Sequence, residues 1–105
     1  MKKILLILFL TILLNSATKA ETIAPDCTYK GIPLYGKVQV VNSFEDFKVK
    51  KVTSGLEDLK VKEVSYFPNS CGKWQFVSTF PDFKIKYVDS FEDFKIRFVD
   101  YFEGI

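Results

Sequence analysis

The sequence predicts a mainly β fold, a compact coil of about six short repeated strands, and three observations support it. From Lys37 to Ile105 one phrase of 11 to 13 residues recurs six times: a Lys, an apolar strand, a Val, a polar turn, a Phe or Leu, then an acidic residue. Apolar residues alternate with Lys inside the copies, which is the period of an extended chain. No segment after the N-terminal leader keeps a helical period. A unit this short cannot bury an apolar face alone, so the copies must stack on one another.

Residues 1–20 have the features of a cleavable export signal. Lys2 and Lys3 form a basic start, residues 4–14 are an apolar run, and residues 18–20 end in a small residue. The run is too short to cross a bilayer easily, which takes about 20 apolar residues. An uncleaved anchor or a buried helix is the alternative. We therefore expect a periplasmic or secreted protein with no stable membrane insertion after leader cleavage.

The mature chain divides into an N-terminal segment, residues 21–35, and a repeat domain, residues 36–105. The chain has two cysteines, Cys27 in the first part and Cys71 in the second. In an oxidising compartment such a pair most often forms a disulfide, and closing a loop of about 45 residues contributes roughly 4 kcal/mol in the chain-entropy model. The alternative is a redox-active thiol pair, which lacks the close Cys-x-x-Cys spacing that this chemistry uses.

Each copy supplies two apolar positions to the predicted repeat core. Phe83, Ile85 and Tyr87 alternate with lysines along one strand, and Val88 follows directly, so its side chain points to the opposite face. One such parity break per copy implies a bend or bulge, and therefore a coil rather than a flat sheet. The predicted core residues are Val38, Val41, Val49, Val52, Val61, Val64, Trp74, Val77, Ile85, Val88, Ile96 and Val99.

Copies two and three differ from the others just before the repeated Val. Four copies carry an apolar residue there, whereas these two carry Lys51 and Glu63. Neighbouring copies would place the two charges in an exposed cross-strand ion pair worth about 0.2 to 1 kcal/mol. We expect an edge or an open face at copies two and three, and better burial in the aromatic-rich copies four to six, which include Trp74.

The residue types argue against catalysis. The chain has no His, which removes the commonest general base and the usual catalytic triads. Three acid pairs remain as candidates for carboxylate chemistry of the glycoside hydrolase kind: Glu45 with Asp46, Glu57 with Asp58, and Glu92 with Asp93. Each pair is a copy of the same turn, where acids are favoured for local hydrogen bonding. We therefore expect no enzymatic activity.

Metal and nucleic acid are also disfavoured as ligands. Recurring aspartates could align oxygen ligands for calcium, but calcium-loaded β-coils use Gly-rich turns and this chain has five Gly. A simpler role for each Asp is to face the repeated Lys of its own or a neighbouring copy. Leader cleavage leaves 12 basic against 13 acidic residues, which removes the argument for nucleic acid. We expect no metal, no cofactor and no nucleic-acid partner.

Three segments, residues 29–38, 71–77 and 82–90, resemble the septoil knot domain family of small exported bacterial β-repeat proteins. The middle segment carries Cys-Gly-Lys-Trp and the last carries Lys-apolar-Lys-aromatic-Val-Asp-Ser. The resemblance implies that residues 36–105 form a β-repeat domain wound into a deep seven-crossing torus knot. It transfers no catalytic or binding residue.

These observations predict an exported, non-catalytic structural or binding module whose partner is a protein or a cell-envelope polymer. A small secreted inhibitor or toxin-like factor is the alternative, and a carboxylate-based glycoside hydrolase ranks third. Both binding hypotheses place the partner near Lys51 and Glu63, on the less apolar side.

Overall fold

The computed structural model of the protein describes residues 22–105, so the predicted export signal, residues 1–20, lies outside the described part. The described chain is entirely β and turn, and this confirms the predicted fold class. Between Thr22 and Ile105 no helix is long and apolar enough to cross a membrane. The strands are β1 (Thr28–Tyr29), β2 (Ile32–Pro33), β3 (Gly36–Val40), β4 (Phe47–Lys51), β5 (Leu59–Glu63), β6 (Lys73–Phe76), β7 (Phe83–Tyr87) and β8 (Phe94–Phe98).

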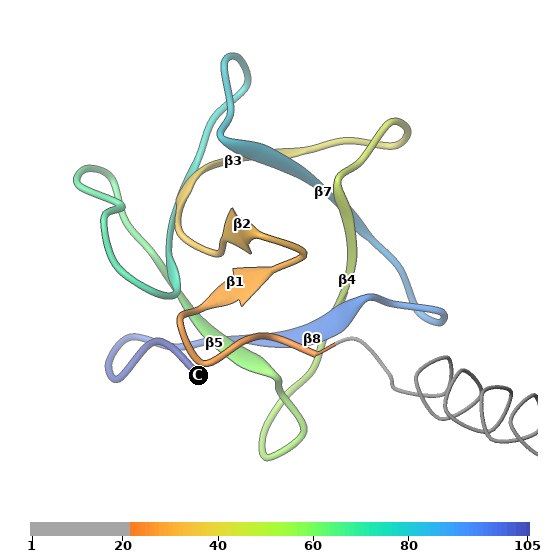
Figure 1. Ribbon diagram of the computed structural model, residues 1–105, viewed down its shortest axis with the longest axis vertical. Helices are drawn as coiled ribbons and strands as arrows, with labels where there is room; N and C mark the ends of the chain where they lie inside the picture. The colour runs from red at the N-terminus through yellow and green to blue at the C-terminus, as the bar shows by residue number, and fades with distance from the viewer. Residues whose placement is uncertain (1–21) are drawn as a thin grey trace, which may run out of the picture.

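Strands β3 to β8, one from each copy, close into a barrel with the order β3-β6-β5-β8-β4-β7 (Figure 1). All six neighbouring pairs are parallel. A closed barrel has no edge strand, so the edge predicted for copies two and three is wrong, although Lys51 and Glu63 are both exposed. The predicted ion pair between Lys51 and Glu63 is also wrong, because β8 lies between β4 and β5.

The copies are interlaced around the barrel rather than laid side by side. Except for β5 and β6, strands that follow each other in the chain are separated by one other strand. Each of the other four connections therefore passes over the strand between, and Figure 1 shows the connections projecting outward from the wall. We call them the outer loops: residues 41–46, 52–58, 64–72, 77–82, 88–93 and the C-terminal segment 99–105.

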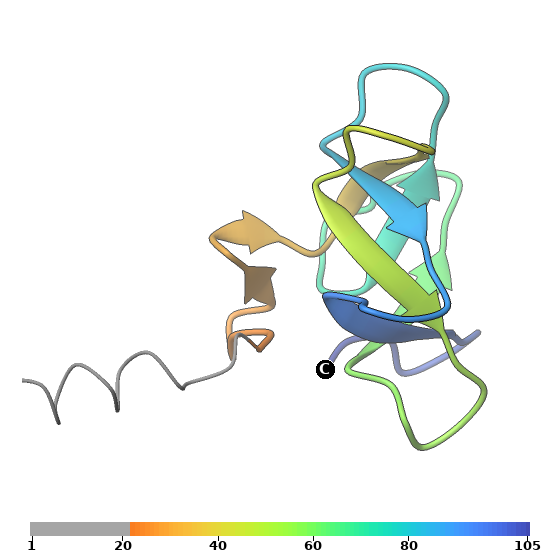
Figure 2. The ribbon, with the colours of Figure 1, turned by 90° about the vertical axis from the view of Figure 1, so that its right-hand side faces the viewer.

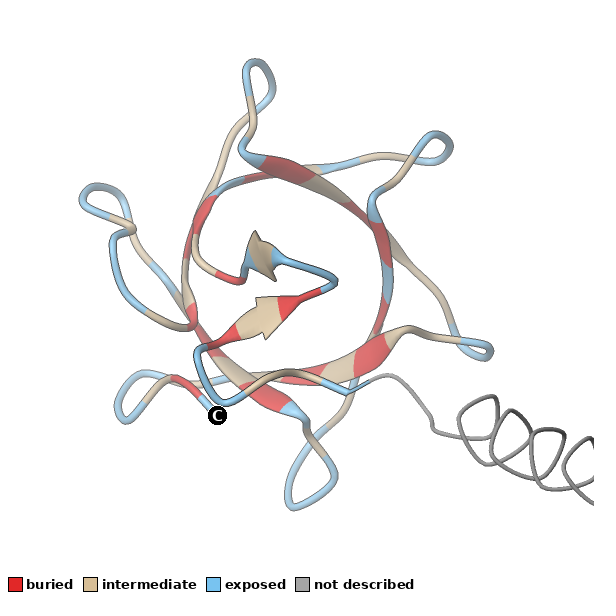
Figure 3. Cartoon of the chain, viewed as in Figure 1, coloured by how far each residue is buried: buried red, intermediate tan, exposed pale blue. Residues whose placement is uncertain are grey.

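The strand alternation places one apolar ring at the centre of the barrel. The inward residues at the strand centres are completely buried, and Figure 3 shows the buried positions distributed around the wall. A second buried ring lies where the strands begin, with Phe47, Leu59, Phe83 and Phe94. The predicted core residues of the central ring are Val38, Val49, Val61, Trp74, Ile85 and Ile96.

The hairpin of β1 and β2 covers the end of the barrel at which the strands begin (Figure 2). The buried Tyr29 ring packs on Phe47 and Phe94, with ring centroids 5.5 and 5.3 Å apart. Cys27 and Cys71 form a disulfide with a Cα–Cα distance of 5.8 Å, as predicted. Leu34 is fully buried, and its carbonyl accepts hydrogen bonds from the Trp74 indole and from the backbone of Gly72. The fourth copy thus receives the N-terminal segment, as its deviant sequence indicates.

The repeated valines differ from the prediction that they belong to the core. They occupy equivalent places, each N–H donating to a carbonyl of an adjacent strand over 2.8 to 2.9 Å, but they are only half-buried and lie outside the buried cluster. The reason is the parity break, which turns each side chain toward the outer side of the wall. These residues are Val41, Val52, Val64, Val77, Val88 and Val99.

Candidate binding surface

Five of the six outer loops carry a Phe at the tip in left-handed backbone. The φ angles lie between 53° and 61°, and the side chains are 77% to 91% exposed. In the remaining loop Gly55 takes the left-handed position, with φ 75°, and the neighbouring Leu56 is 68% exposed. We call these six apolar side chains the tip residues: Phe44, Leu56, Phe67, Phe80, Phe91 and Phe102.

The tip residues are not explained by folding stability. Left-handed backbone costs an L-residue about 1 to 2 kcal/mol, and a bulky residue there is a genuine outlier. A side chain this exposed returns almost no hydrophobic stabilisation. Gly or Asn would satisfy the turn without that cost, as Gly55 does in the second copy. Strained backbone together with exposed aromatic groups is the combination expected of a binding surface.

A clasp fixes the base of each of four outer loops to the strand that the loop crosses. In loop 41–46 the Asp46 carboxylate accepts the backbone N–H of Lys84 at 2.7 Å, while the Asp46 N–H donates to the Lys84 carbonyl at 2.9 Å. In the C-terminal segment, Gly104 exchanges two backbone hydrogen bonds with Lys60 instead. The other three Asp clasps join Asp58 to Lys95, Asp82 to Lys37, and Asp93 to Lys48.

The clasps also account for the acid pairs considered for catalysis. The Asp of each pair binds a backbone N–H in a neighbouring copy. Of the glutamates, Glu57 pairs with Arg97 at 3.0 Å, and this hydrogen bond is the main cause that lowers the pKa of its carboxyl. The pKa of Glu92 is also lowered, first by its own backbone N–H and then by Lys95. The general acid of a glycosidase needs a raised pKa, so the lowered pKa values of these two carboxyls do not suit that role.

The barrel is open at the end where its strands finish. Six inward-facing residues form a ring there, which we call the mouth; around the barrel their order is Val40, Tyr87, Lys51, Phe98, Glu63 and Phe76. Val40 and Phe98 are 45% and 41% exposed. The two charged residues singled out in the sequence therefore share one surface, separated by Phe98.

Contacts within the mouth join its aromatic and charged residues. The rings of Phe76 and Phe98 lie 6.2 Å apart, and the Lys51 ammonium lies 4.6 Å from the centre of the Tyr87 ring. Burial raises the pKa of Tyr87, and the negative charge of Glu63 adds to the shift. The mouth is thus a partly apolar, solvent-exposed ring that contains one positive and one negative group.

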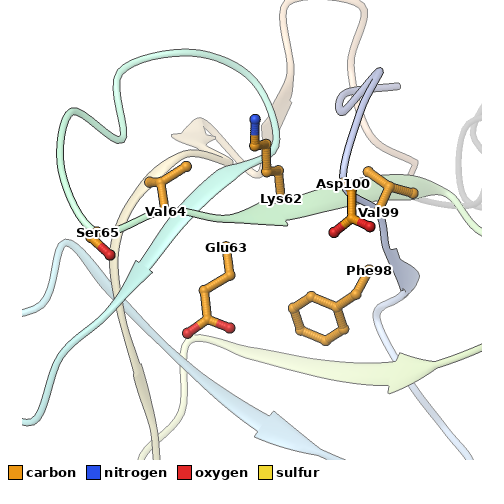
Figure 4. A pocket seen from close by; sticks show the side chains of 7 residues that line it. All are labelled: Lys62, Glu63, Val64, Ser65, Phe98, Val99 and Asp100. Carbon is orange, nitrogen blue, oxygen red and sulfur yellow. The ribbon is translucent and has the colours of Figure 1, made fainter.

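A pocket of about 480 Å³ lies beside the mouth, between the ends of β5 and β8 (Figure 4). In this view Glu63 and Phe98 extend to the same side of the wall, whereas Lys62 extends to the other. Within residues 22–105 no group of three or more His, Cys, Asp or Glu side chains is placed to hold a metal ion. The residues that line the pocket are Lys62, Glu63, Val64, Ser65, Phe98, Val99 and Asp100.

The sequence alone does not distinguish the tip residues, because a Phe that recurs in most copies has the appearance of an ordinary apolar repeat position. The signal that could have revealed them is Gly55, which stands three residues after the repeated Val, where the other five copies have Phe. A position shared by Gly and Phe at the end of a polar turn indicates left-handed backbone with an exposed side chain.

Comparison with known proteins identifies the family of the chain but no protein of known function. None of the curated proteins matches the chain. The family model described as the 7(1) septoil knot domain matches residues 31–105, which include the whole barrel and the second half of the hairpin. The chain therefore belongs to the septoil knot domain family.

Proposed function

We propose that the mature chain is an exported, non-catalytic binding module that contacts a protein or a cell-envelope polymer through its tip residues. The observation that carries the proposal is the recurrence of a strained, exposed Phe in five loops. A single exposed Phe needs no explanation, but five at equivalent strained positions do. The disulfide is compatible with an oxidising compartment outside the cytoplasm.

The four clasped loops are suitable for recognition because both of their ends are fixed, the start by the N–H of the repeated Val and the end by the Asp clasp. A pre-organised loop loses little conformational entropy on binding, so more of its contact energy appears as affinity. The outer loops that carry the tip residues radiate around the whole barrel (Figure 1), so a flat surface reaches only part of the set at once. This arrangement favours a protein or a polymer that wraps around the barrel over a planar bilayer.

The residues next to the tips suggest the chemistry of the partner. An acidic residue directly follows four tip residues, as Glu45, Glu57, Glu92 and Glu103. Apolar rings beside carboxylates complement a surface with apolar pockets and basic or N–H donor groups around them. This proposal assigns the partner surface to the outer loops and not, as the sequence predicts, to the neighbourhood of Lys51 and Glu63.

A small secreted inhibitor or toxin-like factor is the second candidate, and the rigidity of the clasped loops favours it. Inhibitors bind with little change of backbone at the interface, and loops fixed at both ends have that property. The two candidates share the tip residues and differ in where the partner is found: in the producing cell's own envelope or in a host.

The test compares two immobilised, disulfide-bonded variants with the unmodified protein. One replaces Phe44, Phe80 and Phe91 by Asn, which tolerates left-handed backbone. The control replaces three lysines of the outer wall, residues 37, 48 and 86, by Gln. We expect saturable binding to envelope or host extract fractions that the tip variant loses and the control retains. Equal retention by both variants contradicts the proposal.

A further inference from the structure

We propose that the mouth is a self-association surface at which two copies of the chain pack end to end about a two-fold axis. The proposal concerns the open end of the barrel and is independent of the tip residues. It explains why two of the six inward positions at this end carry opposite charges.

The two ends of the barrel are covered differently. The hairpin covers the end where the strands begin, and Tyr29 and Leu34 are 4% and 0% exposed there. At the other end no element within residues 22–105 lies over the mouth, and Val40 and Phe98 remain 45% and 41% exposed. One residue layer deeper the inward side chains are completely buried, so the apolar interior continues up to an uncovered surface.

Lys51 and Glu63 find no opposite charge inside one chain. The ion pairs of the described residues involve neither of them. Both stand in inward-facing positions that the other four copies fill with Val, Phe or Tyr. The Lys51 ammonium covers one face of the Tyr87 ring, which leaves its other N–H donors available.

The order of residues around the mouth makes it complementary to a second copy. A two-fold axis in the plane of the mouth, through Val40 and Phe98, brings Lys51 opposite Glu63 of the second copy, and Glu63 opposite its Lys51. The same rotation brings the remaining two aromatic residues, Tyr87 and Phe76, opposite each other, and sets Val40 and Phe98 against their own copies. Such an isologous contact contains two ion pairs and no like-charge pair.

The surroundings of the mouth fit the anatomy of an interface. Four apolar or aromatic residues lie in the ring, and an exposed polar rim follows the strand ends. Residues 22–105 contain 12 basic and 12 acidic groups, so net charge does not oppose association. The rim residues are Asn42, Thr53, Ser65, Ser78, Asp89 and Asp100.

The contact is small, and the dimer is therefore weak and reversible. The end of one six-stranded barrel lies at the low end of the areas that specific interfaces bury. The outer loops project sideways from the wall, so the dimer leaves them free and presents two sets of tip residues (Figure 1). Two linked sets bind a repeating partner more tightly than either set alone.

The test reverses the two charges by substitution and measures the mass of the disulfide-bonded protein by sedimentation equilibrium, at concentrations between about 1 µM and 1 mM. We expect the unmodified protein to double its mass with concentration. Lys51→Glu and Glu63→Lys should each raise the dimer Kd by at least about tenfold, because each places like charges opposite one another. The two single variants mixed together should form a heterodimer, and the double variant should regain the original Kd.

Lys50→Glu is the matched control, since it makes the same charge change one residue away on the outer face of β4. It should leave the Kd within about twofold. Circular dichroism checks that every variant keeps the barrel. A protein that stays monomeric at the highest concentration overturns the proposal, and so does a mixture of the two single variants that remains monomeric.

Discussion

Replacement of Gly72 by Ala tests the close approach of the Gly72 backbone to Lys60 and Gly104, next to the disulfide. Gly72 and Gly31 have the same φ of +83°, so Ala meets the same left-handed strain at both sites. A Cβ on Gly31 has no atom within 4 Å, whereas a Cβ on Gly72 meets the Lys60 carbonyl oxygen and lies 2.7 Å from the Gly104 nitrogen. These two groups form one of the two backbone hydrogen bonds that hold the C-terminal segment to β5; the other joins the Lys60 N–H to the Gly104 carbonyl, and a displaced segment loses both.

The magnitudes follow from that geometry. Gly31→Ala should lower the free energy of unfolding by about 1 kcal/mol, since 1 to 2 kcal/mol of strain is partly offset by reduced entropy of the unfolded chain. Gly72→Ala adds the loss of two backbone hydrogen bonds and leaves polar groups without partners, about 3 to 4 kcal/mol more. A domain of this size is stable by about 4 to 13 kcal/mol, so the second change removes much of the total.

The assay is thermal unfolding with the disulfide intact, followed by the fluorescence of Trp74, which is the only Trp and is fully buried. At 4 to 8 °C per kcal/mol, we expect Tm to fall by about 5 °C for Gly31→Ala and by more than about 15 °C for Gly72→Ala. Equal shifts for the two variants refute the reasoning, because they leave no energetic effect of the close approach.

Three further predictions concern the tip residues, the clasps and the mouth. Phe91→Asn should keep or raise the free energy of unfolding by up to about 1 kcal/mol in chemical denaturation, because it relieves strain at an exposed site; Phe83→Ala, at a buried site, should lower it by about 3 to 5 kcal/mol. Asp93→Ala should lower it by about 1 to 2 kcal/mol, since a backbone N–H loses its carboxylate acceptor. Burial raises the pKa of Tyr87, so the unfolded chain loses the phenol proton at a lower pH than the folded protein does. The free energy of unfolding should therefore fall as pH rises above about 10. Tyr87→Phe should reduce that fall, whereas Tyr101→Phe should not.

Each of these predictions has an outcome that contradicts it. A loss of several kcal/mol on Phe91→Asn would show that the tip contributes to the fold. Unchanged stability of Asp93→Ala would mean that solvent replaces the carboxylate in the clasp. An alkaline unfolding profile that is the same for the Tyr87→Phe and Tyr101→Phe variants would remove the link between the mouth and the pH dependence.

The periodicity was sufficient to predict the strands and the inward strand centres, and the two cysteines were sufficient to predict the disulfide, because each of these depends on one copy or one pair of residues. It could not predict the order of strands around the barrel. All copies share the same alternation, so the pattern allows any copy to pair with any other. The one sequence sign of the neighbouring pair β5 and β6 is that the fourth copy, which contains β6, is stretched and carries Cys71 ahead of the strand.

The candidate surfaces were only partly predictable, for a related reason. Lys51 and Glu63 were correctly identified as departures from the pattern, but their meaning depends on closure of the barrel. In a flat sheet they would lie at an edge, whereas in a closed barrel they lie at the mouth. The tip residues needed the backbone φ angles, because an apolar residue in a short repeat has the same appearance whether it is buried or exposed.

The first and last strands of the barrel each lie between two others, β3 between β6 and β7, and β8 between β4 and β5. Neither of these two strands can therefore be peeled from the wall along a single edge. A proteolytic machine that unravels its substrate from one terminus would have to open two seams of the wall to remove the first barrel strand that it reaches. Resistance to such degradation follows here from the route of the chain and does not require a large core.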